Sequence, residues 1–225
     1  MSTLLAHDLD SGRATEPVAA RTRALSARRG FLVAAPVLAG ALAVVGAYAD
    51  PAAGISGTEM QALYTANPGP LQFKSLGFHW AYAFWMLPAL LIAPYVRGKG
   101  AWLANVTAFV GFVGISTLPG LLMADWFDSA IGQAVGPDGY AAVVERMDAM
   151  WGVPVMILPG TICLALVLPL TAITLIRAGL VRWWALAAVV AGFAAFLGSS
   201  VMWWGCAIMT VCFAVFAYAL ARTTR

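Results

Sequence analysis

The stretch WWALAAVVAGFAAFLGSSVMWWGCAIMTVCFAVFAYAL, residues 183–220, contains no charged side chain. As a single helix it would be about 57 Å long, roughly twice the hydrocarbon thickness of a bilayer. It therefore predicts two membrane-spanning helices, and the residues Gly198-Ser199-Ser200 are the favoured turn between them. The whole chain agrees with this reading, because 62% of its 225 residues are hydrophobic and only 10% are charged. Soluble domains carry about 25% charged residues, so a soluble domain is excluded.

Further apolar runs complete an all-α fold, which we predict to be a six-helix transmembrane bundle. The expected spans are approximately residues 31–49, 73–96, 101–124, 152–176, 183–199 and 201–221. Residues 30–225 then form a single transmembrane domain. Residues 1–29 hold five arginines among small and polar residues, and we expect them to be a disordered cytoplasmic tail. Short interfacial helices are expected on the extracytoplasmic side, one at residues 58–64 and an amphipathic one at residues 138–151.

Charged residues between the spans separate by sign. Basic residues lie in the N-terminal tail, at residues 97–99 and 177–182, and at the C-terminus, whereas the acids after Glu16 lie in the intervening segments. Cytoplasmic loops carry an excess of Lys and Arg, so we expect both termini in the cytoplasm and the chain in a cell (inner or plasma) membrane. The first span is open to two interpretations. Arg28-Arg29 before an apolar run resembles an export signal that could be cleaved after residue 49, but we favour a retained anchor.

Several kinds of site are excluded by the residues available. The three cysteines lie inside apolar runs and form no C-x-x-C pair. The two histidines, His7 and His79, give no reason to expect a bis-His haem or a multi-His metal centre built by one chain. The chain has no phosphate-binding loop, nucleophile elbow or H-E-x-x-H motif. A net charge of +3 gives no reason to expect a nucleic-acid partner. We therefore expect no metal and no cofactor.

Acidic and aromatic side chains gather at the outer ends of the predicted spans. A carboxylic acid in a low-dielectric pocket can stay protonated near neutral pH, and aromatic faces stabilise a cation. Both are needed to protonate an alkene or epoxide and to guide the resulting carbocation. The candidate catalytic residues are Asp125, Asp128, His79, Asp148 and Glu145. The candidate substrate-binding residues are Trp80, Trp85, Trp126, Trp151, Trp203, Trp204, Tyr82 and Phe84.

Each of these residues also has a structural interpretation. Tryptophan and tyrosine belts mark membrane interfaces in proteins of every function. Glu145 and Asp148 fit the polar face of an interfacial helix, and His79 could hydrogen-bond to a backbone carbonyl inside the bundle. The sequence leaves both sets of alternatives open, and it does not single out one acid as the proton donor.

In size, number of spans and the combination of aromatic span ends with unpaired acids, residues 73–221 resemble the small integral-membrane terpene cyclases of meroterpenoid pathways. The resemblance is one of general architecture, without a motif matched residue by residue. It implies a membrane enzyme that cyclises or isomerises an isoprenoid or prenylated substrate by metal-independent acid catalysis. Asp125 or Asp128 would be the general acid and His79 its orienting partner. The chain is also similar to uncharacterised multi-pass proteins of Ala- and Val-rich bacterial proteomes.

Two other functions remain as alternatives. The chain could be a non-enzymatic accessory or immunity subunit of a membrane complex, since small-residue stretches such as Ala187 to Ala195 permit close helix contacts. It could also be a small lipid transporter, which at this length would need an oligomer for alternating access. The expected partners are membrane lipid and an apolar, isoprenoid-type substrate.

Overall fold

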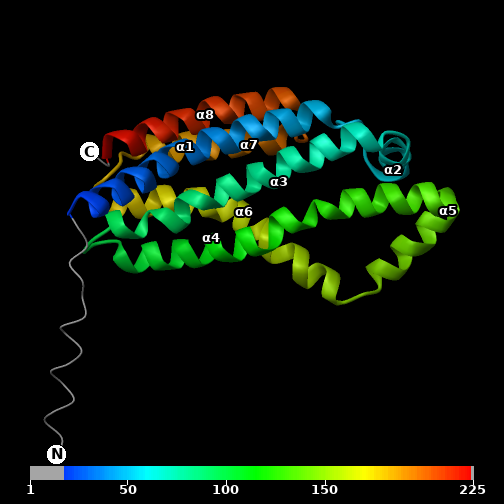
Figure 1. The fold of residues 1–225 in the computed structure, drawn as a ribbon, viewed down its shortest axis with the longest axis horizontal. Coiled ribbons are helices and arrows are strands. Elements are labelled where there is room, and N and C mark those ends of the chain that lie inside the picture. Colours follow the sequence, from blue (N-terminus) through cyan, green and yellow to red (C-terminus); the bar gives the residue numbers. More distant parts are fainter. Residues whose placement is uncertain (1–17, 224–225) are drawn as a thin grey trace, which may run out of the picture.

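In the computed structural model the backbone is described for residues 18–223 and the side chains for residues 24–222 (Figure 1). Every secondary-structure element of residues 18–223 is a helix, without a β-strand, which confirms the all-α prediction. Its elements are α1 (Val18–Ala49), α2 (Gly57–Ala66), α3 (Pro68–Leu91), the 3-10 turn η1 (Ala93–Tyr95), α4 (Ala101–Leu121), α5 (Met123–Asp148), α6 (Gly152–Arg177), α7 (Trp184–Gly198) and α8 (Trp203–Thr223).

Five helical stretches are long and apolar enough to cross a membrane, and they mark the chain as a membrane protein. They are Ala24–Ala49, Pro68–Tyr95, Ala101–Asp148, Gly152–Arg177 and Trp203–Arg222. The sequence predicts six. The difference is α7, whose 15 residues make a helix of about 22 Å, shorter than the roughly 30 Å hydrocarbon core.

The turn inside the uncharged stretch 183–220 lies where the sequence predicts it. Helix α7 ends at Gly198, and α8 begins at Trp203. Between them Ser200 and Val201 have φ angles of 52° and 63°, in the left-handed region that non-glycine residues rarely adopt. These two residues reverse the chain, and α7 then packs against α8.

The helices lie side by side, and the chain turns alternate between the two ends of the bundle (Figure 1). The start of α1, the turns that follow η1 and α6, and the C-terminal end of α8 lie at one end. Helix α2 and the kinked part of α5 lie at the other. The basic residues at 97–99, at 177–182 and at Arg222 therefore share one end of the bundle, and the charge separation read from the sequence becomes a separation in space.

Helix α1 begins earlier than the apolar run 31–49. Residues 1–17 of the predicted disordered tail lie outside the described residues, but the prediction is wrong for residues 18–29, where the backbone is helical. Alanine and arginine, which dominate this part, are strong helix formers. The Arg29 Nη2 atom also donates to the carbonyl oxygen of Ala221 at 3.0 Å, close to the C-terminal end of α8, where helix carbonyls lack intrahelical partners.

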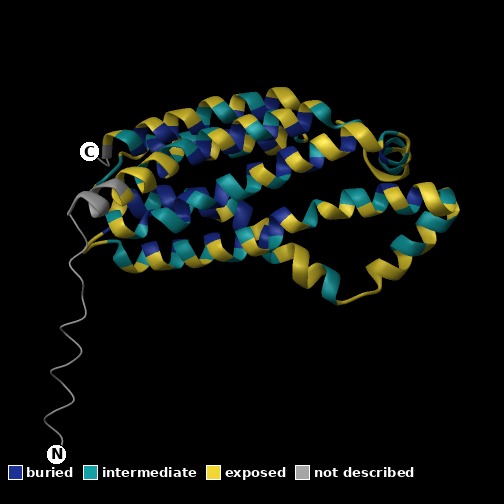
Figure 2. Cartoon of the chain, viewed as in Figure 1, coloured by how far each residue is buried: buried dark blue, intermediate teal, exposed yellow. Residues whose placement is uncertain are grey.

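The buried residues lie mainly where the helices face one another (Figure 2). Helix α1 packs against α3 and α8, while α4 packs against α3 and α6. Small residues allow the closest approach, because a Cβ atom added to Gly77 on α3 would lie 2.7 Å from the backbone of Gly46 on α1. Backbones in such contact gain van der Waals packing that larger side chains would prevent.

Replacing Gly77 by alanine is expected to destabilise the protein by about 2 kcal/mol, because the added methyl group collides with backbone that cannot move aside. Thermal unfolding in detergent micelles measures the effect. Gly120→Ala on α4 is the matched control, since an added Cβ there meets nothing within 4 Å. Equal unfolding temperatures for the two variants would contradict the close packing of α1 on α3.

The two segments predicted to form short helices outside the spans are helical in the structure. Residues 58–64 lie within α2, and most of residues 138–151 form the second half of α5. Gly136 divides α5 with φ 70° and ψ −179°, a conformation that is essentially restricted to glycine. Pro137 then opens the second half, where its missing N–H costs no helical hydrogen bond. At this break α5 turns back toward α6 (Figure 1).

Candidate functional site

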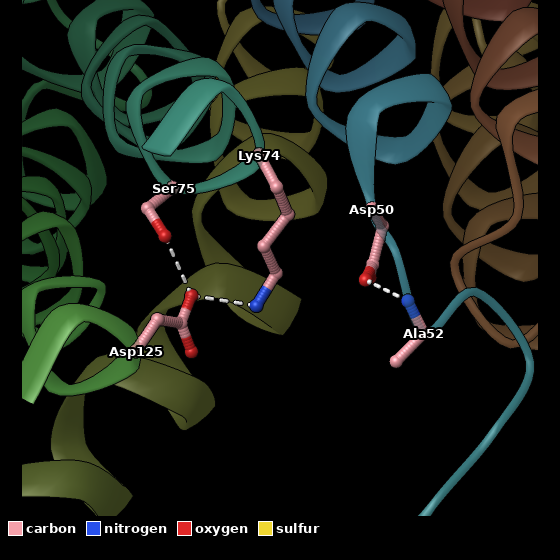
Figure 3. Close-up of polar contacts among 5 residues, drawn as sticks. All are labelled: Asp50, Ala52, Lys74, Ser75 and Asp125. Atoms are coloured by element: carbon pink, nitrogen blue, oxygen red, sulfur yellow. Dashed lines mark hydrogen bonds and ion pairs between the residues drawn. The ribbon is translucent and has the colours of Figure 1, made fainter. Parts of the chain in front are cut away.

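One ion pair is found among the side chains of residues 24–222, and it joins α3 to α5 (Figure 3). Lys74 Nζ lies 2.6 Å from Asp125 Oδ2, and the hydroxyl of Ser75 donates to the same oxygen at 2.8 Å. The Lys74 and Asp125 side chains are only 11% and 17% exposed. Buried charges are costly unless paired, so this pair fixes the start of α5 against the start of α3.

Lys74 also contacts Tyr64 on α2. Its Nζ lies 4.7 Å from the centroid of the phenol ring, within the range of a cation–π interaction. Burial raises the pKa of Tyr64; the nearby Lys74 ammonium opposes this rise, and Asp50 and Asp125 add to it. The phenol therefore stays neutral at physiological pH, and Lys74 joins three helices by one side chain.

Helix α2 is attached to the first half of α5 by two further hydrogen bonds. The hydroxyl of Ser129 donates to the carbonyl oxygen of Tyr64 at 2.8 Å, and Gln133 Nε2 donates to that of Thr65 at 3.1 Å. These carbonyls belong to the last turn of α2, which has no intrahelical donors for them. Gly132 permits the contact, because a Cβ atom there would collide with the Thr65 hydroxyl.

A pocket of about 750 Å³ lies between α2 and α5. Its lining residues are mostly small or apolar: Gly57, Thr58, Met60, Gln61, Ala62, Thr65, Ala66, Gly132, Pro137, Tyr140, Ala141, Val144, Glu145 and Asp148. Ligand pockets commonly have volumes of about 300–1,000 Å³ and mostly apolar walls. The α2–α5 pocket, as we call it, is therefore large enough for a lipid-like molecule.

The break in α5 shapes this pocket. Asp128, in the first half of α5, and Tyr140, in the second half, lie close enough to interact electrostatically. Because Gly136 lies between them, this interaction joins the two halves of the broken helix. Tyr140 thereby becomes part of the pocket wall.

The predicted acids are divided between two places. Asp125 accepts hydrogen bonds from Lys74 and Ser75, an arrangement that suits a structural carboxylate and not a proton donor. Glu145 and Asp148 are exposed and line the α2–α5 pocket. His79 fits its structural interpretation, a hydrogen bond to a backbone carbonyl, because its Nδ1 lies 2.9 Å from the carbonyl oxygen of Pro119. The hydrogen bond requires the tautomer with the proton on Nδ1.

The predicted aromatic wall is not assembled around the α2–α5 pocket. Trp85 is 1% exposed and lies in the bundle core, while Trp126 lines a separate pocket of about 240 Å³. Tyr82 and Phe84 are partly buried against the core. The other four tryptophans of the predicted wall are exposed at the helix surfaces: Trp80, Trp151, Trp203 and Trp204. Helical rotation explains part of this result, because five residues turn α3 by about 140° between Trp80 and Trp85.

Three residues of this region are not among the site residues predicted from the sequence. Lys74 could have been suspected from its position, since only it and Arg146 are basic among the acids of the outer segments. Tyr140 and Gln61 gave no sequence signal. Gln61 lines the α2–α5 pocket, and its Oε1 atom is buried without a hydrogen-bond partner.

Comparisons with protein-family models, with curated protein sequences and with solved structures find no match to this chain. In the described residues, no group of three or more His, Cys, Asp or Glu side chains is arranged to hold a metal ion.

Proposed function

We propose that this chain is an integral membrane protein that binds a lipid-like molecule at the extracytoplasmic end of its helical bundle. The observation that carries the proposal is the α2–α5 pocket, with its volume of about 750 Å³ and its largely apolar lining. Such a pocket excludes water from an acyl or isoprenoid chain, and burial of apolar area stabilises the complex. Lipid binding of this kind would fit an accessory subunit of a membrane complex or a small lipid transporter.

The proposed orientation follows the charges. With α7 as a short sixth span, both termini lie in the cytoplasm together with the basic end of the bundle. Helix α2 and the second half of α5 then lie at the extracytoplasmic membrane surface. A lipid could reach the pocket from the adjacent leaflet without crossing the bundle.

Acid-catalysed cyclisation or isomerisation of an isoprenoid substrate is a second proposal, favoured by one observation. Two carboxylates, Glu145 and Asp148, line an otherwise apolar pocket. Tyr140 is the single aromatic residue in that wall, so little of the expected cation-stabilising surface is present. We therefore place binding ahead of catalysis. The test is to incubate membranes that contain the wild type or Glu145→Gln/Asp148→Asn with a farnesylated acceptor. If the double variant forms the same amounts of product as the wild type, the catalytic proposal is wrong.

A pocket-filling substitution tests lipid binding. Ala141 and Ala142 are adjacent and both exposed, but only Ala141 lines the pocket. We expect Ala141→Trp to reduce lipid bound to the purified protein, measured by native mass spectrometry from mild detergent, at least about tenfold. Ala142→Trp is the matched control and should retain wild-type lipid. Equal lipid content in all three proteins would overturn the proposal.

A further inference from the structure

We infer that the α2–α5 pocket selects an amphiphile with a cationic headgroup, an amine or quaternary ammonium on an apolar chain. The inference rests on the proposed lipid binding and names the ligand class. Glu145 and Asp148 are the charged side chains in the pocket lining, which contains no Lys, Arg or His. These negatively charged carboxylates would attract a positively charged headgroup on the ligand.

The second half of α5 presents its lining residues as one stripe. Pro137, Tyr140, Ala141, Val144, Glu145 and Asp148 recur at alternating spacings of three and one, the pattern of a single helical face. Along this face the side chains change from apolar to acidic toward the C-terminal end of the helix. An amphiphile laid along the stripe would place its chain on Ala141 and Val144 and its head beside Glu145 and Asp148.

Neither carboxylate at this end of the pocket forms an ion pair with another side chain of the described residues 24–222. Asp148 is the last residue of α5, and helix C-termini already carry partial negative charge that disfavours acids. The single ion pair found among the described side chains is Lys74 with Asp125. Arg146 is exposed and is not among the residues that line the pocket. A ligand cation would meet two unpaired carboxylates at this end of the pocket.

The opposite wall of the pocket adds acceptors and no competing cation. Gln61 on α2 lines this wall, and its Oε1 atom is buried without a hydrogen-bond partner. An ammonium that carries N–H bonds can donate to an acceptor, and a quaternary ammonium is attracted by charge alone, whereas phosphate and carboxylate heads carry the same sign of charge as Glu145 and Asp148. An anionic lipid or prenyl diphosphate would therefore meet repulsion from α5 and no donor of opposite charge.

The test uses photoreactive probes with one common tail. Dodecyl chains with a diazirine and a trimethylammonium, hydroxyl or phosphate head are cross-linked to the whole chain in nanodiscs of an uncharged galactolipid, whose headgroup carries no ammonium. Mass spectrometry measures labelling of the peptide that holds residues 137–148. Labelling of the exposed apolar face of α4, around Phe109 and Phe112, corrects for the partition of each probe into the bilayer.

We expect the ammonium probe to reach half-maximal labelling at about tenfold lower concentration than the alcohol, with the phosphate probe weakest, and the advantage to shrink in 500 mM salt. The double variant Glu145→Gln/Asp148→Asn should reduce labelling by the ammonium probe to the level of the alcohol probe. Labelling by the alcohol probe should not change. Equal labelling by all three heads, or an unaffected double variant, would overturn the inference.

Failure of the underlying lipid-binding proposal has a different signature. If Ala141→Trp leaves the labelling of every probe unchanged relative to Ala142→Trp, the pocket is not the binding site and both proposals fall. If the three probes label the wild-type protein equally and Ala141→Trp prevents the labelling by all of them, lipid binding stands and only the headgroup assignment is wrong. An unfolding temperature of Glu145→Gln/Asp148→Asn equal to that of the wild type would show that the two exposed carboxylates do not stabilise the fold.

Discussion

Replacing Asp125 by alanine is expected to lower the free energy of unfolding by about 3 kcal/mol. The substitution leaves the Lys74 ammonium in a site where it is only 11% exposed and has no other carboxylate bonded to it. It also removes the acceptor of the Ser75 hydroxyl. The loss of one partner of a buried pair is costly because the remaining charge has exchanged water for that partner.

The measurement is the unfolding midpoint in mild detergent, with Glu145→Ala as control. Glu145 is an acid on the same helix but is exposed, so its removal should change stability by less than about 0.5 kcal/mol. The neutral pair Lys74→Gln/Asp125→Asn should recover most of the lost stability, since no charge is then buried. If the double variant is as unstable as Asp125→Ala, the ion pair does not hold α5 on α3.

The Asp125 result also bears on catalysis. A general acid must release and recover a proton during turnover. The Asp125 Oδ2 atom accepts hydrogen bonds from both Lys74 and Ser75, an arrangement that favours the carboxylate over the protonated acid. We therefore expect the effect of Asp125→Asn on any activity to follow the loss of folded protein, and the activity per folded molecule to stay constant.

Replacing Trp85 by alanine is expected to cost about 4 kcal/mol. The indole is 1% exposed, and its ring centroid lies 4.8 Å from Phe213, 5.6 Å from Phe196 and 5.9 Å from Phe193, all edge to face. These contacts connect α3 with α7 and α8. Loss of the ring leaves a large cavity among rigid aromatic neighbours that cannot collapse to fill it.

Two further tryptophan variants make this prediction specific. Trp102→Ala removes an indole that is 76% exposed and should have a small effect on the unfolding midpoint. Trp85→Phe keeps an aromatic ring and removes the indole Nε1, which is buried without a hydrogen-bond partner; we expect it to cost less than about 1 kcal/mol. Equal destabilisation by Trp85→Ala and Trp102→Ala would show that the aromatic cluster does not organise the core.

The sequence alone determined the helical, membrane-spanning character of the chain. Hydropathy and the spacing of charges depend only on composition along one segment at a time, so the uncharged stretch 183–220 and its turn at Gly198 were predictable. The early start of α1 at Val18 was missed because low hydrophobicity was taken as disorder, although alanine and arginine form helices readily.

Only the tertiary structure decided which side chains meet. Lys74 and Asp125 are 51 residues apart, and Trp85 finds its partners on α7 and α8. Helical periodicity fixes which residues share a face, but the rotation of each helix and the choice of its neighbours follow from packing of all helices at once. The α2–α5 pocket has the same origin, since it depends on the break at Gly136 and on the close approach that Gly132 permits between two segments distant in the chain.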